Sequence, residues 1–81
     1  MPSIRTFRRL DLRPLLARGE PPLAHVEQRV DALRPGEGLI VIAPFLPSPM
    51  IEIMKSQGIQ SRVEPGNRGV WIVYLWRQAE H

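Results

Sequence analysis

The residue types that most often perform chemistry are scarce in this chain or stand apart from one another. Cysteine is absent, which excludes thiol nucleophiles, persulfide carriers, zinc–thiolate sites and iron–sulfur clusters. The two histidines, His25 and His81, are far apart, and no serine stands near a residue that could act as its base. No glycine motif for phosphate binding is present. We therefore predict that the protein is not an enzyme and has neither cofactor nor metal site.

One group of residues is a candidate interaction surface. In the topology derived below, the ends of the first two strands and the N-termini of both helices meet at one edge, where anions can bind. The predicted surface consists of Arg13, Arg18, Glu20, Pro22, Phe45, Leu46 and Pro47. It would be an apolar patch with an arginine rim that binds a protein partner or a small anionic ligand. The alternative is that the apolar loop only covers the helix ends and that the arginines are solvated.

The positive charge of the chain is concentrated at its beginning. The formal net charge is +3, and residues 1–18 contain five arginines and a single acidic residue. Arginine suits phosphate contacts, so an arginine-rich first strand offers RNA binding as an alternative function. Because the excess is confined to 18 residues and the tryptophans lie far along the chain, we do not expect nucleic acid to be the partner.

Length and composition limit the elements that can position such a surface. Eighty-one residues with 43% hydrophobic side chains predict a single domain over residues 1–81, with its core in about residues 6–77. No apolar stretch is long enough to span a membrane, and the first residues lack an apolar signal segment. These features predict a cytoplasmic protein that does not associate with membranes.

Prolines and glycines divide the chain into short elements. Alternating and β-branched runs predict strands over residues 6–12, 38–43, 59–64 and 70–77, and residues 13–21 are expected to be a loop that tucks Leu15 and Leu16 under the domain. A first helix is predicted from the Pro21–Pro22 pair to residue 33. A second is predicted from Ser48, as its N-cap, to residue 58.

This order predicts an α+β fold, a two-layer βαβαββ sandwich. Right-handed crossovers make the first three strands parallel, and the closing hairpin makes the fourth antiparallel. The mixed four-stranded sheet would then carry both helices on one face.

The last strand is apolar on both of its faces. Trp71, Val73 and Leu75 alternate with a second set of apolar residues, Val70, Ile72, Tyr74 and Trp76. We expect the first set to line the core and the second to be covered by a second copy of the chain in a homodimer. The alternative is that the aliphatic stems of Arg8, Arg62 and Arg77 cover it.

Three short motifs in order carry a family resemblance. They are Leu10-Asp11-Leu12-Arg13 leading into Gly19-Glu20-Pro21-Pro22-Leu23, then Arg34-Pro35-Gly36-Glu37 before the second strand, and Phe45-Leu46-Pro47-Ser48-Pro49-Met50 after it. Over about residues 8–77 the chain resembles the TusA/SirA-like superfamily of small sulfur-carrier domains. The third motif is similar to the Phe-x-Pro-x-Pro-hydrophobic segment of a related family, the one catalogued as domain of unknown function 2249.

The resemblance implies the fold but not sulfur transfer. In the sulfur carriers, a Cys-Pro-x-Pro segment opens the first helix, and its cysteine carries sulfur as a persulfide. In this chain Gly19 stands at the cysteine position and Glu20 at the first proline. The related family implies a loose association with hemerythrin-like and redox-related proteins, and no catalytic residue. We therefore predict a cysteine-free, non-enzymatic module for protein interaction or ligand binding.

Overall fold

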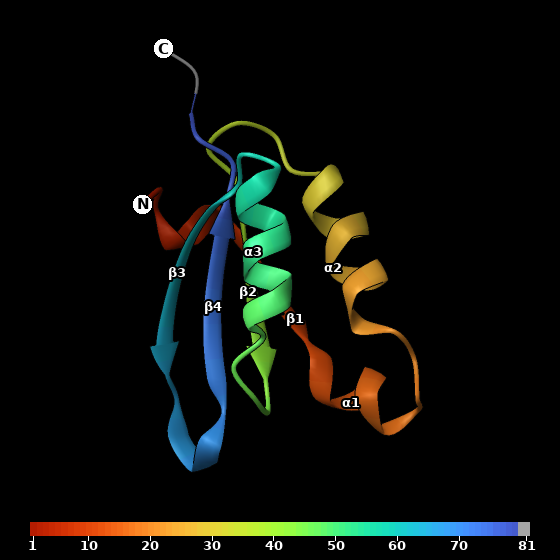
Figure 1. Ribbon diagram of the computed structural model, residues 1–81. Coiled ribbons are helices and arrows are strands. Elements are labelled where there is room, and N and C mark those ends of the chain that lie inside the picture. Colours follow the sequence, from red (N-terminus) through yellow and green to blue (C-terminus); the bar gives the residue numbers. More distant parts are fainter. Residues whose placement is uncertain (80–81) are drawn as a thin grey trace.

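A mixed four-stranded sheet forms one layer of the molecule and α-helices form the other, as Figure 1 shows. The computed structural model describes residues 1–79. The strands are β1 (Phe7–Asp11), β2 (Gly38–Ala43), β3 (Gln60–Pro65) and β4 (Trp71–Trp76). The α-helices are α1 (Leu12–Ala17), α2 (Pro22–Asp31) and α3 (Ser48–Ser56), and two short 3-10 turns are η1 (Ile4–Thr6) and η2 (Asn67–Gly69).

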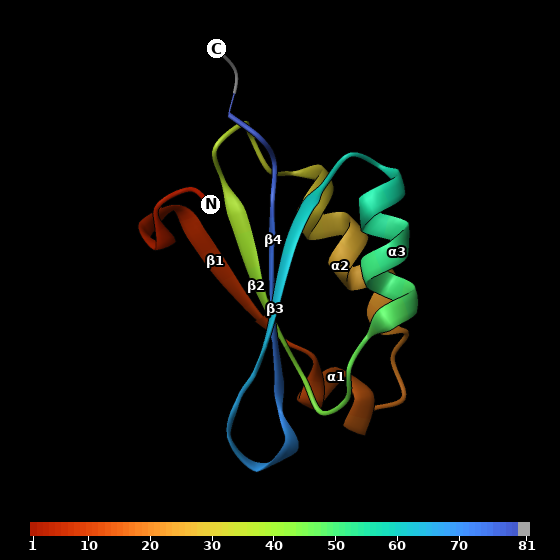
Figure 2. The ribbon, with the colours of Figure 1, turned by 60° about the vertical axis from the view of Figure 1, so that its left-hand side comes forward.

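The strands lie in the order β1-β2-β4-β3. Strand β1 runs parallel to β2, and β4 runs antiparallel to both of its neighbours, β2 and β3. The predicted directions are therefore confirmed, as is the α+β fold class. Figure 2 shows α2 and α3 on one side of the sheet and leaves its other face without a covering helix.

Helix α1 replaces most of the loop that the sequence predicted over residues 13–21. It forms because the Asp11 carboxylate accepts a hydrogen bond from the backbone N–H of Arg13 at 3.0 Å, which caps the helix. Pro14 lies in the first turn, where a backbone N–H is not needed. Leu15 is buried, as expected, and Leu16 is half-buried. The loop prediction was wrong because a helix of six residues, fewer than two turns, is too short to show a period.

The other two helices follow their predicted apolar faces. Val26 and Val30 of α2 are buried. The helix ends at Asp31, before its predicted end at residue 33. The sequence predicted Ser48 as the N-cap of α3, but Ser48 is the first residue of the helix and Pro47 is its N-cap. The backbone N–H of Ser48 donates to the Leu46 carbonyl at 2.9 Å.

The hydrophobic core lies between the sheet and the helices. From the sheet it contains Leu39, Val41, Val73 and Leu75, which are at most 1% exposed. Val73 and Leu75 thus occupy the predicted face, together with a half-buried Trp71. Within residues 1–79, no helix is long and apolar enough to cross a membrane.

The opposite face of the sheet is partly covered by its own side chains. Ile72, Tyr74 and Trp76 are half-buried there, and the Phe7 ring meets the Tyr74 ring edge-on at 6.1 Å. Two of the arginines expected to cover this face lie elsewhere. Arg8 pairs with Leu39 on the helix side of the sheet, and Arg77 donates to the Leu33 carbonyl of the segment after α2.

Candidate functional site

An apolar cleft lies where α2 and α3 begin. Its volume is about 180 Å³. We call it the proline cleft, and its lining residues are Leu12, Pro22, Leu23, Phe45, Pro47, Pro49, Met50 and Ile53. All of them are apolar. The cleft therefore lies between the first residue of α1, the starts of α2 and α3, and the loop after β2.

Prolines remove backbone N–H donors from the helix starts around this cleft. The first residues of a helix normally present unbonded N–H groups. In α2 the N-cap and first positions are Pro21 and Pro22, and in α3 the N-cap and second positions are Pro47 and Pro49. Proline has no backbone N–H. Four of the donors that could bind an anion at this edge are consequently missing.

The two arginines of the predicted rim are paired within the chain. The Nη2 atom of Arg13 lies 2.7 Å from the Asp11 Oδ2 atom, and Arg18 Nε donates to Glu20 Oε2. The hydrogen bond from Arg13 lowers the pKa of Asp11, and the bond from Arg18 lowers the pKa of Glu20. Their charges are therefore compensated, and none of Arg13, Arg18 and Glu20 lines the cleft.

The apolar residues of the predicted surface divide into two groups. Pro22, Phe45 and Pro47 line the cleft together. Leu46 lies outside the lining and is 44% exposed, beside a Phe45 that is 47% exposed. The structure thus brings three of the predicted residues into one cleft with a fourth next to it.

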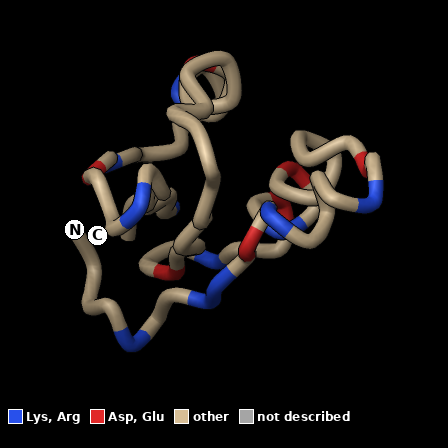
Figure 3. Tube along the Cα trace, turned by 90° about the horizontal axis from the view of Figure 1, so that it is seen from below, with Lys and Arg blue, Asp and Glu red and all other residues tan. Residues whose placement is uncertain are grey.

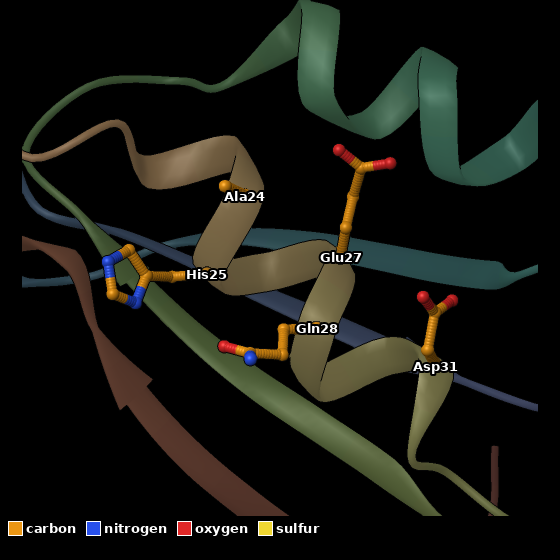
Figure 4. A pocket seen from close by; sticks show the side chains of 5 residues that line it. All are labelled: Ala24, His25, Glu27, Gln28 and Asp31. Atoms are coloured by element: carbon orange, nitrogen blue, oxygen red, sulfur yellow. The ribbon is translucent and has the colours of Figure 1, made fainter.

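The side chains around His25 do not converge on one point. A shallow hollow on the outer side of α2 is lined by Ala24, His25, Glu27, Gln28 and Asp31. Figure 4 shows these side chains splayed from the helix, with His25 and Gln28 directed to one side and Glu27 and Asp31 to the other. His25 Nε2 instead lies 3.1 Å from Glu20 Oε1. Among residues 1–79 no three acidic or histidine side chains form a group that could hold a metal ion, and His81 lies outside these residues.

A second, polar pocket was not anticipated from the sequence. Its volume is about 640 Å³, and it is lined by Thr6, Arg8, Arg29, Ala32, Leu33, Arg34, Glu37, Gly38 and Leu39. We call it the arginine pocket. Its three arginines come from β1, from α2 and from the segment after α2, so no local motif reveals them. Figure 3 shows that the basic residues near the N-terminus follow one another along the trace before the first acidic residue.

Comparison with known proteins gives one family match. A family model described as "Uncharacterized conserved protein (DUF2249)" matches residues 9–77. No curated protein and no solved structure matches the chain.

Proposed function

Because this chain belongs to the DUF2249 family of uncharacterised conserved proteins, we propose a function from the geometry of its own surface. The protein is a non-enzymatic interaction module that receives one bulky apolar side chain of a partner protein in the proline cleft. The observation that carries this proposal is the lining of the cleft, whose side chains are all apolar and whose two helix starts lack four backbone N–H donors.

The size of the cleft favours a side chain over a cofactor or metabolite. Pockets for small-molecule ligands typically measure about 300–1,000 Å³. The proline cleft measures about 180 Å³, close to the roughly 150 Å³ of a cavity that holds one benzene molecule. A leucine, methionine or phenylalanine side chain matches this volume.

The surroundings of the cleft favour a neutral apolar group. The nearby charges of Arg13 and Arg18 are compensated by Asp11 and Glu20, so an anion gains little there. Phe45 and Leu46 extend the apolar surface beyond the cleft and would contact the partner around the inserted side chain. The prolines restrict the backbone of both helix starts, which reduces the entropy lost on binding.

The element order also supports a relation in fold to the TusA/SirA-like sulfur carriers, without their activity. The position equivalent to their cysteine is Gly19, which has a φ of +73° and cannot carry sulfur. We expect no protein-bound persulfide after incubation with a persulfide donor. Mass spectrometry would detect it as an added sulfur on the 9.3 kDa chain.

RNA binding through the N-terminal strand has less support. Two of the five arginines in residues 1–18 are paired within the chain, which leaves fewer for contacts with phosphate. With so few contacts, any RNA affinity should be weak at physiological salt.

The proposal is tested by NMR titration of the isotope-labelled chain with capped single amino acids. N-acetyl-leucinamide and N-acetyl-phenylalaninamide should shift the amide signals of the cleft residues, whereas N-acetyl-serinamide should not. At about 0.3 kcal/mol for each non-hydrogen atom, the affinity of such small probes is roughly millimolar.

Two tryptophan variants provide the control. Ile53 is half-buried in the cleft, and Ile53→Trp should fill it and abolish the shifts. Lys55 is exposed on the same helix, and Lys55→Trp should leave them unchanged. Equal shifts with the serine probe, or equal loss in both variants, would show that the cleft is not the binding site. A partner that binds the wild type should also be lost by the double variant Phe45→Ser, Leu46→Ser while the fold persists.

A further inference from the structure

The arginine pocket is lined by three arginines for which the structure records no ion pair among residues 1–79. Arg8, Arg29 and Arg34 are all exposed. Within residues 1–79, none of them has a carboxylate closer than 4.0 Å, whereas Arg13 and Arg18 both do. Three unpaired arginines around one pocket repel each other, which an anionic ligand would relieve.

The end of α2 does not need these arginines. The carbonyls at the C-terminus of a helix attract cations. Arg77 from the end of β4 already satisfies two carbonyls of this region, because its Nε donates to the Leu33 carbonyl at 2.9 Å and its Nη2 donates to the Val30 carbonyl at 3.1 Å. Arg8, Arg29 and Arg34 are therefore available for a ligand.

The other polar groups of the pocket are occupied. Glu37 is the one acidic residue among the lining residues, and its Oε1 atom accepts a hydrogen bond from the backbone N–H of Arg34 at 2.8 Å. The Thr6 hydroxyl is 2.8 Å from the Ser3 carbonyl and 3.0 Å from the Gly36 carbonyl. Three arginines and one glutamate leave the lining with an excess of two positive charges.

We propose that the arginine pocket binds a small molecule that carries two adjacent phosphate groups. The planar guanidinium group matches phosphate oxygens through paired hydrogen bonds. The volume of about 640 Å³ lies within the usual range for small-molecule sites and exceeds that of the proline cleft. Because the arginines come from three segments, a ligand with two phosphates can contact all three sides. This site lies by the C-terminal end of α2, whereas the proline cleft lies at its N-terminal end, and the proposal is independent of the one for that cleft.

The test is isothermal titration calorimetry of the full chain with inorganic pyrophosphate at 0.15 M salt, a concentration at which exposed charges are screened beyond about 8 Å. Arg29→Gln and Arg34→Gln should each raise the dissociation constant by roughly tenfold, since each removes a charge-assisted hydrogen bond. Arg68→Gln, in the exposed η2 turn, removes the same charge elsewhere and should leave the constant unchanged. Thermal unfolding verifies that all three variants fold.

Four results would overturn the proposal. The first is no heat of binding at millimolar pyrophosphate. The second is an equal effect of Arg68→Gln and the pocket variants, which would indicate attraction by net charge alone. The third is binding of a single-stranded RNA oligonucleotide that the pocket variants weaken, with no binding of pyrophosphate. Citrate serves as the carboxylate comparison, and tighter binding of citrate than of pyrophosphate would contradict the phosphate class.

Discussion

Asp11 links the sheet to the first helix. It is the last residue of β1, it caps α1 through the backbone N–H of Arg13, and it also binds the Arg13 guanidinium. The side-chain hydrogen bond from Arg13 lowers the pKa of Asp11 in the folded state. A carboxyl group with a lowered folded pKa stabilises the fold above its unfolded pKa, about 3.9, and loses this contribution as the pH falls through the folded value.

Two substitutions at Asp11 separate the cap from the charge. Asp11→Ala should lower the free energy of unfolding by about 1 kcal/mol at pH 7, the usual cost of losing an N-cap. Asp11→Asn keeps a capping oxygen but loses the ion pair. The Asp11 side chain is 34% exposed, so screening should limit that loss to less than about 1 kcal/mol. Urea denaturation between pH 2 and 7 should show the wild type to be more stable than Asp11→Asn above about pH 4. This difference in the free energy of unfolding should fall to zero as the pH is lowered further. A difference that persists unchanged at pH 2 would contradict the role of the charge.

The sequence identified part of the proline cleft and none of the arginine pocket. Pro22, Phe45 and Pro47 could be placed at one edge because prolines mark helix starts and because parallel strands end on the same side. The pairing of Arg13 with Asp11 and of Arg18 with Glu20 depends on the turns around α1, which the sequence did not reveal. Arg8, Arg29 and Arg34 meet only through the register of β1 on β2 and the position of α2.

An aromatic ring packs closely over a glycine where β1 pairs with β2. Phe7 is the register partner of Gly38, and a Cβ atom at residue 38 would come closer than 3.0 Å to the Phe7 ring. The same ring lies 6.4 Å from the Trp76 ring across β2. The Phe7 ring thus covers the backbone of Gly38 in β2 and contacts Trp76 in β4.

Gly38→Ala should destabilise the protein by about 1–3 kcal/mol because the Phe7 ring must move. Alanine is intrinsically better than glycine in a strand by about 0.5–1 kcal/mol. In the background of Phe7→Ala, the substitution Gly38→Ala should therefore become neutral or slightly stabilising. Urea denaturation of the four proteins in this double-mutant cycle measures the coupling. An equal cost of Gly38→Ala in both backgrounds would show that the ring is not the obstacle.

Elements with a clear period were predictable, and the shortest element was not. The continuous β-branched run fixed β2 at residues 38–43, and the spacing of Val26 and Val30 revealed the buried side of α2. Helix α1 has only six residues and is capped by Asp11. Its existence is decided by a side-chain hydrogen bond and by the burial of Leu12 and Leu15, neither of which a short window of sequence displays.

The open face of the sheet has an apolar centre and charged margins. In successive rows, Ile40 and Tyr74 lie between Arg9 and Arg62, and Ile42 and Ile72 lie between Asp11 and Glu64. Each margin thus carries one basic and one acidic residue. The Tyr74 hydroxyl donates to Glu64 Oε1 at 2.8 Å.

This pattern suits a second copy of the chain packed face to face. One possible two-fold axis lies parallel to the face and perpendicular to the strands. It places Arg62 of one copy opposite Glu64 of the other. An axis along the strands sets Arg9 against Arg62 and is repulsive. Three strands of six residues and one of five span roughly 400 Å². This is about half of the roughly 800 Å² that each partner buries in a standard interface. We therefore predict a weak homodimer.

Sedimentation equilibrium from 10 µM to 1 mM protein should show a mass that rises from 9.3 kDa toward twice that value. Arg62→Glu should weaken the dimer, and the exchanged pair Arg62→Glu, Glu64→Arg should restore it, since the opposite charges still meet across the axis. The exposed control is Arg68→Glu, outside the face, which should not affect the dimer. A constant mass of 9.3 kDa up to 1 mM, or no effect of Arg62→Glu, would contradict this arrangement.

The strand order has a consequence for the growth of the sheet. Strands β1 and β3 are its two edges, and an unprotected edge can accept further strands without limit, as in fibrils. Edge β1 bears Arg8, Arg9 and Asp11, while edge β3 bears Arg62 and Glu64 and ends at Pro65, which lacks a backbone donor. The two most apolar strands, β2 and β4, are enclosed between them. We therefore expect the sheet not to grow beyond its four strands, so that any association through the open face stays finite.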